Sequence, residues 1–273
     1  ADEGFPSIQK ADKEITAICL RKNGKSVVLG CGDFKTDDEN VSYLKCKDEK
    51  TLLSNFLKVW NHSSWKPDIV TGWNVEMFDI PYLANRIRNQ LGEEHVKMLS
   101  PWRMVNRREI VRGKSVARAG KQLENRIDEV FELYGISVLD YLQLYKKFSF
   151  GNQESYKLDY IAQIEIGEKK IDYSEYGNLL ELYKKNFQKF IEYNIYDCAL
   201  VDRIDAKLKF IEQVMALAYD AKVNYNDTMT TVRPWDVIIH NYLLDRRIVI
   251  PQFIPDHRPF DLVGGYVKDP ILG

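Results

Sequence analysis

The strongest constraint on the fold is a short apolar run that changes directly into a helical pattern, with an acid at the junction. Residues 67–73 (Pro-Asp-Ile-Val-Thr-Gly-Trp) have the length and composition of a buried strand. From Asp79 onward, apolar residues recur on one helical face: Ile80, Leu83, Ala84 and Ile87. Gly92 is placed to end this helix. A strand that feeds a helix is typical of layered folds, so we predict an α/β protein with a mixed sheet flanked by helices.

The residues before this junction supply further strands. Asn23-Gly24 separates β-branched runs at 15–20 and 26–31, which predicts a β-hairpin because both turn residues tolerate positive φ. A third strand is predicted at 41–45, and Asp48 is placed to cap the helix that follows. The apolar positions of that helix keep a 3.6-residue period: Leu52, Leu53, Phe56, Leu57 and Trp60.

The second half of the chain is predicted to be mainly helical. One long helical pattern runs from about residue 179 to about residue 218. The other predicted elements are a strand at 136–141, a short helix at 158–163, a helix around 235–243 and a strand at 248–250. The character of the sequence changes near 215–225, where we place a domain boundary.

Composition narrows the class of protein. Hydrophobic residues make up 45% of the 273 residues, which is enough for a core. The 39 basic and 40 acidic side chains give a net charge of −1, which argues against a uniformly basic nucleic-acid coat but not against a local basic groove. The cysteines lack zinc-like spacing, so we expect reduced thiols in an intracellular protein: Cys19, Cys31, Cys46 and Cys198. No apolar run of about 20 residues is present to span a membrane.

A basic run lies between residues 101 and 121. It holds seven cationic side chains against the single acid Glu109: Arg103, Arg107, Arg108, Arg112, Lys114, Arg118 and Lys121. Such a run is typical of a solvated surface loop or hairpin, and its alternative is a patch that contacts a phosphate backbone.

A tyrosine and an acid lie four residues apart in an apolar helical stretch at 190–197. This spacing places Tyr193 and Asp197 on one helical face. Asp79 lies 118 positions earlier, so the two acids meet only if the chain folds back on itself. Carboxylates suit Mg²⁺ or Mn²⁺, and we interpret the pair as ligands of divalent metal in a nuclease. In two-metal phosphoryl transfer one ion generates hydroxide and the other stabilises the leaving oxygen.

Each of these residues also has a purely structural interpretation. Asp79 can be a helix N-cap, and Asp197 can be a solvent-facing acid on a long helix. Tyr193 can orient the attacking water or can be an ordinary buried tyrosine. Asn74 and Phe78 can contact the sugar and base of a nucleotide, or can end the strand and fill the core.

Two motifs resemble those of family B DNA polymerases. The pattern Asn74-x-x-x-Phe78-Asp79 is similar to the second exonuclease motif of that family, and Tyr193-x-x-x-Asp197 is similar to the third. Further segments resemble the polymerases of T-even-like phages: Thr71-Gly72-Trp73-Asn74, Ile80-Pro81-Tyr82, Ser137-Val138-Leu139-Asp140-Tyr141, Leu144-Tyr145-Lys146-Lys147-Phe148 and Trp235-Asp236. The resemblance covers nearly the whole chain in order.

The resemblance implies a ribonuclease-H-like (DnaQ-like) fold and a 3′→5′ exonuclease that removes mispaired nucleotides from a primer 3′ end. It implies that Asp79 and Asp197 are ligands of two divalent ions, Mg²⁺ or Mn²⁺, and that Tyr193 positions the water. Asn74 and Phe78 would then hold the frayed 3′ end of the DNA.

The resemblance also suggests roles for two segments near the motifs. Phe5 is similar to an aromatic residue that stacks on the terminal base, although a loop phenylalanine fits the sequence equally well. The basic run, together with residues 122–133, falls where the family has a hairpin that helps strand separation.

Two departures from the family pattern shape the expected organisation. The first exonuclease motif, Asp-x-Glu, is absent because Asp2 and Glu3 are adjacent acids, and the chain stops before the motif of the polymerase palm. We therefore expect an internal fragment with an exonuclease domain at 1–214 that lacks its leading strand. Residues 215–252 resemble the return to the polymerase N-terminal domain, and 253–273 resemble the start of the palm.

The implied partners are the single-stranded 3′ end of primer–template DNA and the remainder of the polymerase chain. A sliding clamp and other replisome proteins are further candidates, and the implied location is the cytoplasm of an infected bacterium. With two metal ions incompletely liganded, we expect weak or no activity from this chain alone. The alternatives are a non-catalytic DNA-binding subunit of a split polymerase and a stand-alone exonuclease that acts on RNA.

Overall fold

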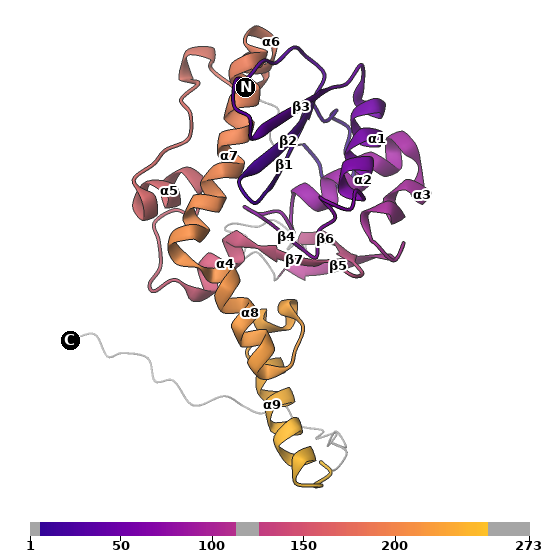
Figure 1. Ribbon diagram of the computed structural model, residues 1–273, viewed down its shortest axis with the longest axis vertical. Coiled ribbons are helices and arrows are strands. Elements are labelled where there is room, and N and C mark those ends of the chain that lie inside the picture. Colours follow the sequence, from indigo (N-terminus) through magenta and orange to yellow (C-terminus); the bar gives the residue numbers. More distant parts are fainter. Residues whose placement is uncertain (1–5, 113–125, 251–273) are drawn as a thin grey trace, which may run out of the picture.

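The computed structural model of the protein describes residues 6–112 and 126–250. Within these residues, helices and three small β-sheets form a mixed α/β arrangement (Figure 1). Asn23 and Gly24 have φ angles of 51° and 77°, so the first strand turns into the second through two residues, as the sequence predicted.

The strands form one mixed sheet and two separate pairs in the described parts of the chain. Their bounds are β1 (Ala17–Lys22), β2 (Lys25–Gly30), β3 (Val41–Lys45), β4 (Ile69–Gly72), β5 (Val105–Arg112), β6 (Arg126–Leu133) and β7 (Ser137–Asp140). β1 and β2 are antiparallel, and β3 runs parallel to β2. β4 pairs with β7 in parallel, and β5 pairs with β6 in an antiparallel hairpin. The predicted mixed sheet is therefore three-stranded here, with the other strands in sheets of their own.

The helices connect and cover these strands. The α-helices are α1 (Glu49–Trp60), α2 (Asp79–Leu91), α3 (Glu93–Val96), α4 (Tyr141–Phe148), α5 (Leu158–Ile166), α6 (Leu179–Lys185), α7 (Phe187–Leu208), α8 (Phe210–Ala221) and α9 (Val232–Asp245). Three short 3₁₀ helices also occur in the described residues: η1 (Lys97–Leu99), η2 (Ser174–Tyr176) and η3 (Tyr225–Met229). Asp48 caps α1 by accepting a hydrogen bond from the Thr51 amide, as predicted.

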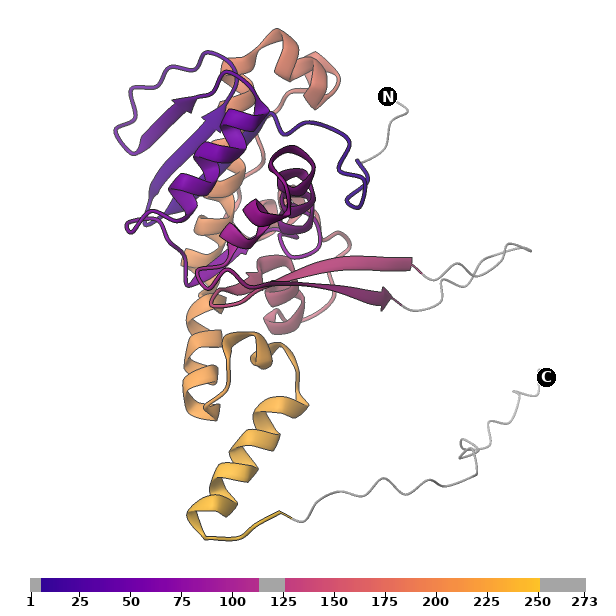
Figure 2. The same cartoon turned by 90° about the vertical axis from the view of Figure 1, so that its right-hand side faces the viewer.

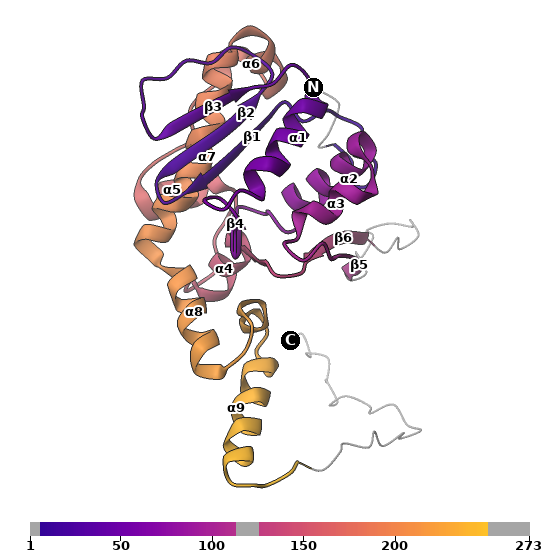
Figure 3. The ribbon, with the colours of Figure 1, turned by 45° about the vertical axis from the view of Figure 1, so that its right-hand side comes forward.

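The central strand β2 is buried along almost its whole length, from Ser26 to Gly30. Helix α1 packs on one face, where Leu53 and Phe56 join Val27 and Leu29 in the main core. Helix α7 lies across the other face of the sheet (Figure 3). Because helices cover both faces, α7 is held in a fixed position relative to β1 and β2.

The single long helix predicted from about residue 179 to about residue 218 is wrong. The chain instead forms α6, α7 and α8. Asn186 ends α6, and its side chain caps α7 by accepting the Lys189 amide. Lys209 takes a left-handed conformation with φ 56° between α7 and α8, and the Asp205 side chain accepts the Ile211 amide beyond it. Each break is a single non-helical residue, which hardly changes the spacing of the apolar residues along the sequence. The helical pattern therefore did not reveal the breaks.

The C-terminal part of the described chain extends away from the main body as α8, η3 and α9 (Figure 2). The strand predicted at 248–250 is wrong, since these residues pair with no strand in the described ranges and the Ile248 amide donates to the Leu243 carbonyl. Helix α8 is continuous across residues 214 and 215, where the exonuclease domain is expected to end. Among the helices described, none has both the length and the apolar character needed to cross a membrane.

Candidate functional site

The turn between β4 and α2 is held by one buried carboxylate. Asp140 ends β7 directly beside Gly72, the last residue of β4. Its side chain accepts hydrogen bonds from the amide of Asn74 at 3.0 Å and from the amide of Glu76 at 3.2 Å, and also caps α4 at the Leu142 amide. Burial raises the pKa of Asp140, and these amide donors offset part of that effect. Asn74 has a φ of 66°, a conformation that asparagine tolerates better than most residues.

This arrangement predicts a large effect at Asp140. Asp140→Asn is expected to lower the free energy of unfolding by about 2–3 kcal/mol, because an amide group at this buried position leaves at least one of the three N–H donors without its acceptor. Urea unfolding followed by circular dichroism measures the change. Asp48→Asn is the matched control, since asparagine caps a helix about as well as aspartate. A loss at Asp140 no larger than the loss at Asp48 would contradict the role assigned to Asp140.

Asp79 is the first residue of α2, as the sequence predicted. The N-cap position belongs to Phe78 and shows no side-chain capping bond, so Asp79 does not serve as the N-cap. One side of Asp79 is open to solvent, yet the surrounding protein desolvates its carboxyl group and raises its pKa to about 6. Its own backbone amide lowers the pKa in part, and the nearby Asp140 carboxylate adds to the increase.

Asp197 lies on α7 in contact with a lysine that no sequence pattern singled out. The Lys170 ammonium group lies 2.5 Å from Asp197 Oδ2 and 3.1 Å from the Tyr193 hydroxyl. Its Nζ also lies 5.3 Å from the centroid of the Tyr193 ring. Burial raises the pKa of Asp197, and the adjacent ammonium offsets only part of this increase. For Lys170, burial acts against the charged form, but the interactions with Asp197 and Tyr193 together outweigh burial, so the pKa of Lys170 is raised.

Lys170 is itself held in place by its backbone. Its amide donates to Asp159 Oδ1 at 2.7 Å, which links it to the first turn of α5. In the sequence, Lys170 is one of 39 basic residues and follows Gly167, which ends α5 in a left-handed conformation. It belongs to no periodic pattern and to neither acidic motif, so only the tertiary structure identifies it.

The second oxygen of Asp197 tests whether the site suits a metal ion. Among the described residues, no hydrogen-bond donor reaches the buried Asp197 Oδ1. A buried acceptor that has no donor is uncommon, and a carboxylate oxygen in this state suits a hard divalent cation. The donor chemistry of Asp79 and Asp197 therefore fits Mg²⁺ or Mn²⁺. The described residues contain no group of three or more His, Cys, Asp or Glu side chains arranged to hold a metal ion.

The partly buried Cys198 thiol is influenced by the charges of both acids. The pKa of Cys198 is raised mainly by its interaction with Cys19 and by burial, and also by the charges of Asp197 and Asp79. Both carboxylates therefore lie within electrostatic range of the same sulfur atom. Tyr193 is 9% exposed and its ring meets Tyr173 edge-on, so it is buried. Its hydroxyl and Asp197 contact the same Lys170 ammonium group.

The predicted DNA-contacting residues divide into two groups. Asn74 and Phe78 lie in the turn that leads into α2, and the Phe78 ring stacks on Tyr82 with a centroid separation of 5.8 Å. Phe5 lies outside the described residues. Part of the basic run forms β5 of a hairpin with β6, while residues 113–125 lie outside the described ranges. Contact of the basic run with a phosphate backbone stays a prediction.

Comparison with known proteins identifies the class. Residues 1–161 match the family described as DNA polymerase family B, exonuclease domain. The chain therefore belongs to family B of the DNA polymerases and contains its exonuclease domain.

Individual relatives place the chain more narrowly. It is 41% identical over 235 residues to a DNA-directed DNA polymerase of Escherichia phage RB69, which covers 85% of this chain and 24% of the relative. It is 36% identical over 268 residues to a DNA-directed DNA polymerase of Enterobacteria phage T4, covering 97% of this chain and 27% of the relative. A DNA polymerase delta catalytic subunit of Caenorhabditis elegans is 26% identical over 190 residues. The chain spans about a quarter of the length of the two phage relatives.

Proposed function

We propose that this protein is the proofreading region of a phage-type DNA polymerase, a 3′→5′ exonuclease that acts on single-stranded DNA ends. The main support is the buried Asp197 Oδ1, which lacks a donor among the described residues and belongs to the acid that the motif resemblance marks as a ligand. We propose the ribonuclease-H-like variant of the α/β fold, with an exonuclease domain at 1–214, a segment at 215–252 that returns to the N-terminal domain, and the start of the palm at 253–273.

Asp79 and Asp197 would hold divalent metal, on which the exonuclease domains of this family generally depend. When bound, the metal would supply Lewis-acid activation of water and stabilisation of the leaving oxygen. Two carboxylates are a small ligand set for two cations, which supports weak activity of this chain by itself. The raised pKa of Asp79 means that lowering the pH below about 6 protonates a ligand and weakens metal affinity.

The protein's own side chains would position the reacting groups. Tyr193 presents its hydroxyl beside Asp197, where it orients water by hydrogen bonding. Lys170 holds both Tyr193 and Asp197, so the ammonium fixes the direction of the carboxylate and stabilises negative charge on the scissile phosphate. Asn74 and Phe78 would contact the terminal nucleotide, with Phe5 as a further stacking group.

The proposed partners follow from the phage relatives. They are the single-stranded 3′ end of primer–template DNA and the remainder of the polymerase chain, and the proposed location is the cytoplasm of the infected bacterium. A sliding clamp and other replisome proteins are proposed as further partners.

Degradation of an end-labelled single-stranded oligonucleotide tests this function. With Mg²⁺ or Mn²⁺, we expect loss of a 3′ label long before loss of a 5′ label. Removal of the metal with EDTA is expected to lower the rate at least about a hundredfold, because the metal generates the nucleophile. Binding of the oligonucleotide without any cleavage would instead favour the non-catalytic DNA-binding subunit, and cleavage that persists in EDTA would contradict the metal assignment.

A further inference from the structure

One face of α2 is polar and, for most of its length, buried against the protein. Tyr82, Asn85, Arg86 and Asn89 recur at the spacing of a single helical stripe. We call these four residues the α2 clamp. Tyr82, Asn85 and Arg86 are less than 10% exposed and pack against protein, whereas Asn89 at the end of the stripe is exposed.

The α2 clamp binds the backbone of residues 7–15, a segment without helix or strand. Every member donates to a main-chain carbonyl: Tyr82 Oη to Lys13 at 2.5 Å, Asn85 Nδ2 to Ile8 at 3.0 Å, Arg86 Nη1 to Ala11 at 2.9 Å and Asn89 Nδ2 to Lys10 at 3.0 Å. These side chains replace the ladder partners that a strand would have, so they determine the path of the segment.

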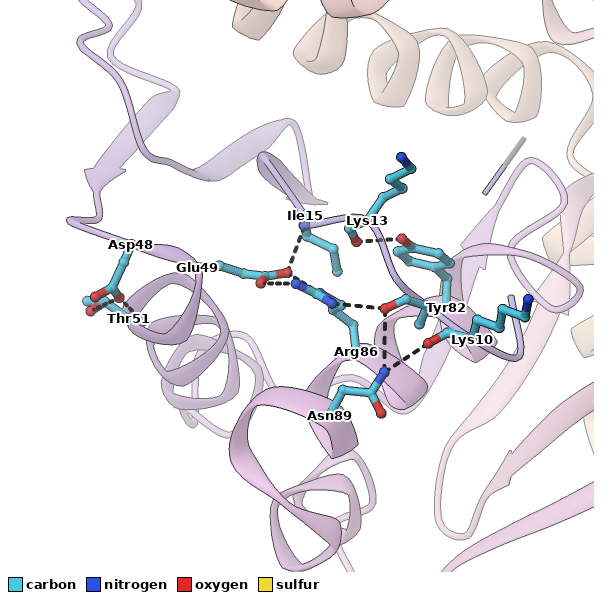
Figure 4. Close-up of polar contacts among 10 residues, drawn as sticks. Lys10, Lys13, Ile15, Asp48, Glu49, Thr51, Tyr82, Arg86 and Asn89 are labelled. Carbon is cyan, nitrogen blue, oxygen red and sulfur yellow. Dashed lines mark hydrogen bonds and ion pairs between the residues drawn. The ribbon is translucent and has the colours of Figure 1, made fainter. Parts of the chain in front are cut away.

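A buried ion pair fastens the clamp to α1. Arg86 donates from Nε and Nη2 to the two oxygens of Glu49, each at 2.6 Å (Figure 4). Glu49 Oε1 also accepts the amide of Ile15 at 2.7 Å. Both side chains are about 90% buried, so this bidentate pair is fixed in one geometry.

The clamp is continuous with the proposed strand-binding site. The Tyr82 ring stacks on Phe78 with an interplanar angle of 15°, and Phe78 immediately precedes Asp79. The Tyr82 hydroxyl is anchored at Lys13, so its ring links Phe78 to the segment at 7–15. That segment directly follows Phe5 and Pro6 in the sequence.

We infer that the α2 clamp positions Phe78 and the 7–15 segment relative to each other, and thereby fixes the width of the site for the 3′-terminal nucleotide. The inference rests on the proposed function, because it assigns Phe78 to the strand end. Tyr82 is a positioning residue in this account: it is 7% exposed and acts on the strand through Phe78. Its aromatic ring prevents Phe78 from turning away, and its hydroxyl prevents the ring itself from moving.

Binding of a single-stranded oligonucleotide with 2-aminopurine as its 3′-terminal base tests the inference. The measurement is made in EDTA, so that no metal-dependent cleavage occurs, and gives both the Kd and the fluorescence of the bound terminal base. Tyr82→Phe is expected to raise Kd about threefold, the effect of one lost hydrogen bond. Tyr82→Leu is expected to raise it about tenfold and to reverse much of the quenching that stacking on Phe78 causes.

Tyr43→Phe is the matched control. The Tyr43 hydroxyl also donates to a backbone carbonyl, that of Gly32 at 2.7 Å, and its ring packs on Phe34 in a different part of the protein. The Tyr43→Phe substitution removes the same kind of hydrogen bond, but far from Phe78. We therefore expect it to change neither the Kd nor the fluorescence of the terminal base. An oligonucleotide with 2-aminopurine at an internal position is expected to report no difference in quenching among the variants.

The outcomes separate this inference from the proposed function. If the wild-type protein does not bind the oligonucleotide, the proposed function fails and the inference fails with it. If the wild type binds and quenches the terminal base but both Tyr82 variants behave like Tyr43→Phe, only the inference is overturned. Tyr82→Phe retains the ring and is expected to remain folded by circular dichroism, so a purely structural defect would be visible as a loss of folded protein.

Discussion

Asp197→Ala is expected to remove metal-dependent loss of 3′ nucleotides while leaving α7 folded. The substitution deletes the only buried carboxylate oxygen that has no donor among the described residues, and it also releases Lys170 from its 2.5 Å contact. The rate is expected to fall by at least about a hundredfold, since loss of a partner outside the metal's ligand shell already reduces affinity or activity 10–100-fold. Release of a 3′-labelled nucleotide in Mg²⁺ or Mn²⁺ measures the effect.

A second acid on the same helix provides the control. Asp202 is also paired with a cation, Arg21 at 2.5 Å, but its side chain is 46% exposed. Asp202→Ala is therefore expected to change the rate less than about twofold, because an exposed ion pair contributes little. If both variants cleave at the wild-type rate, Asp197 is not a metal ligand. If both lose activity, the loss comes from α7 in general and not from the carboxylate at 197.

Arg86→Ala is expected to lower the free energy of unfolding by about 3–5 kcal/mol, because it leaves the Glu49 carboxylate buried without its cation. The Glu49 and Arg86 side chains are 10% and 11% exposed, so water replaces little of the lost contact. The carbonyl of Ala11 also loses the shorter of its two hydrogen bonds and keeps only the one from Asn89 Nδ2 at 3.4 Å. Urea unfolding, with the m-value checked for constancy, gives the difference in stability.

Two further variants make this result specific. Lys97→Ala removes the cation from an exposed pair with Glu94 and is expected to change stability by less than about 1 kcal/mol. The double substitution Arg86→Met with Glu49→Leu removes both charges together and is expected to recover most of the loss, since a buried pair can be replaced by apolar groups. If the double variant is less stable than Arg86→Ala, an unpaired charge does not explain the loss.

The sequence predicted those elements whose local chemistry determines them. Asn23-Gly24 fixed a two-residue hairpin, and Asp48 marked the start of α1, because both depend only on neighbouring backbone groups. The beginning of α2 at Asp79 was predicted for the same reason. The breaks at Asn186 and Lys209 were missed, since each interrupts the helix for one residue without disturbing the apolar pattern.

The site was only partly accessible from the sequence. Asp79, Tyr193 and Asp197 were found through their motifs, whereas Lys170 reaches Asp197 through a connection that has no periodicity. The buried polar positions of α2 were missed because Asn85 and Arg86 look like solvent-exposed positions in the helical pattern. Their hydrogen-bond partners include main-chain carbonyls of residues 7–15, and no sequence pattern indicates that this segment lies beside α2.

The α2 clamp binds only main-chain atoms of residues 7–15, so this segment is expected to tolerate most side-chain substitutions. The α2 clamp holds carbonyl groups that every amino acid possesses, so the side chains at Ile8, Lys10 and Lys13 can vary without loss of these bonds. Ala11 is the exception, because it is fully buried and has a φ of 42°. Among related polymerases, the path of this segment is therefore expected to persist where its sequence has diverged, with residue 11 restricted to small side chains.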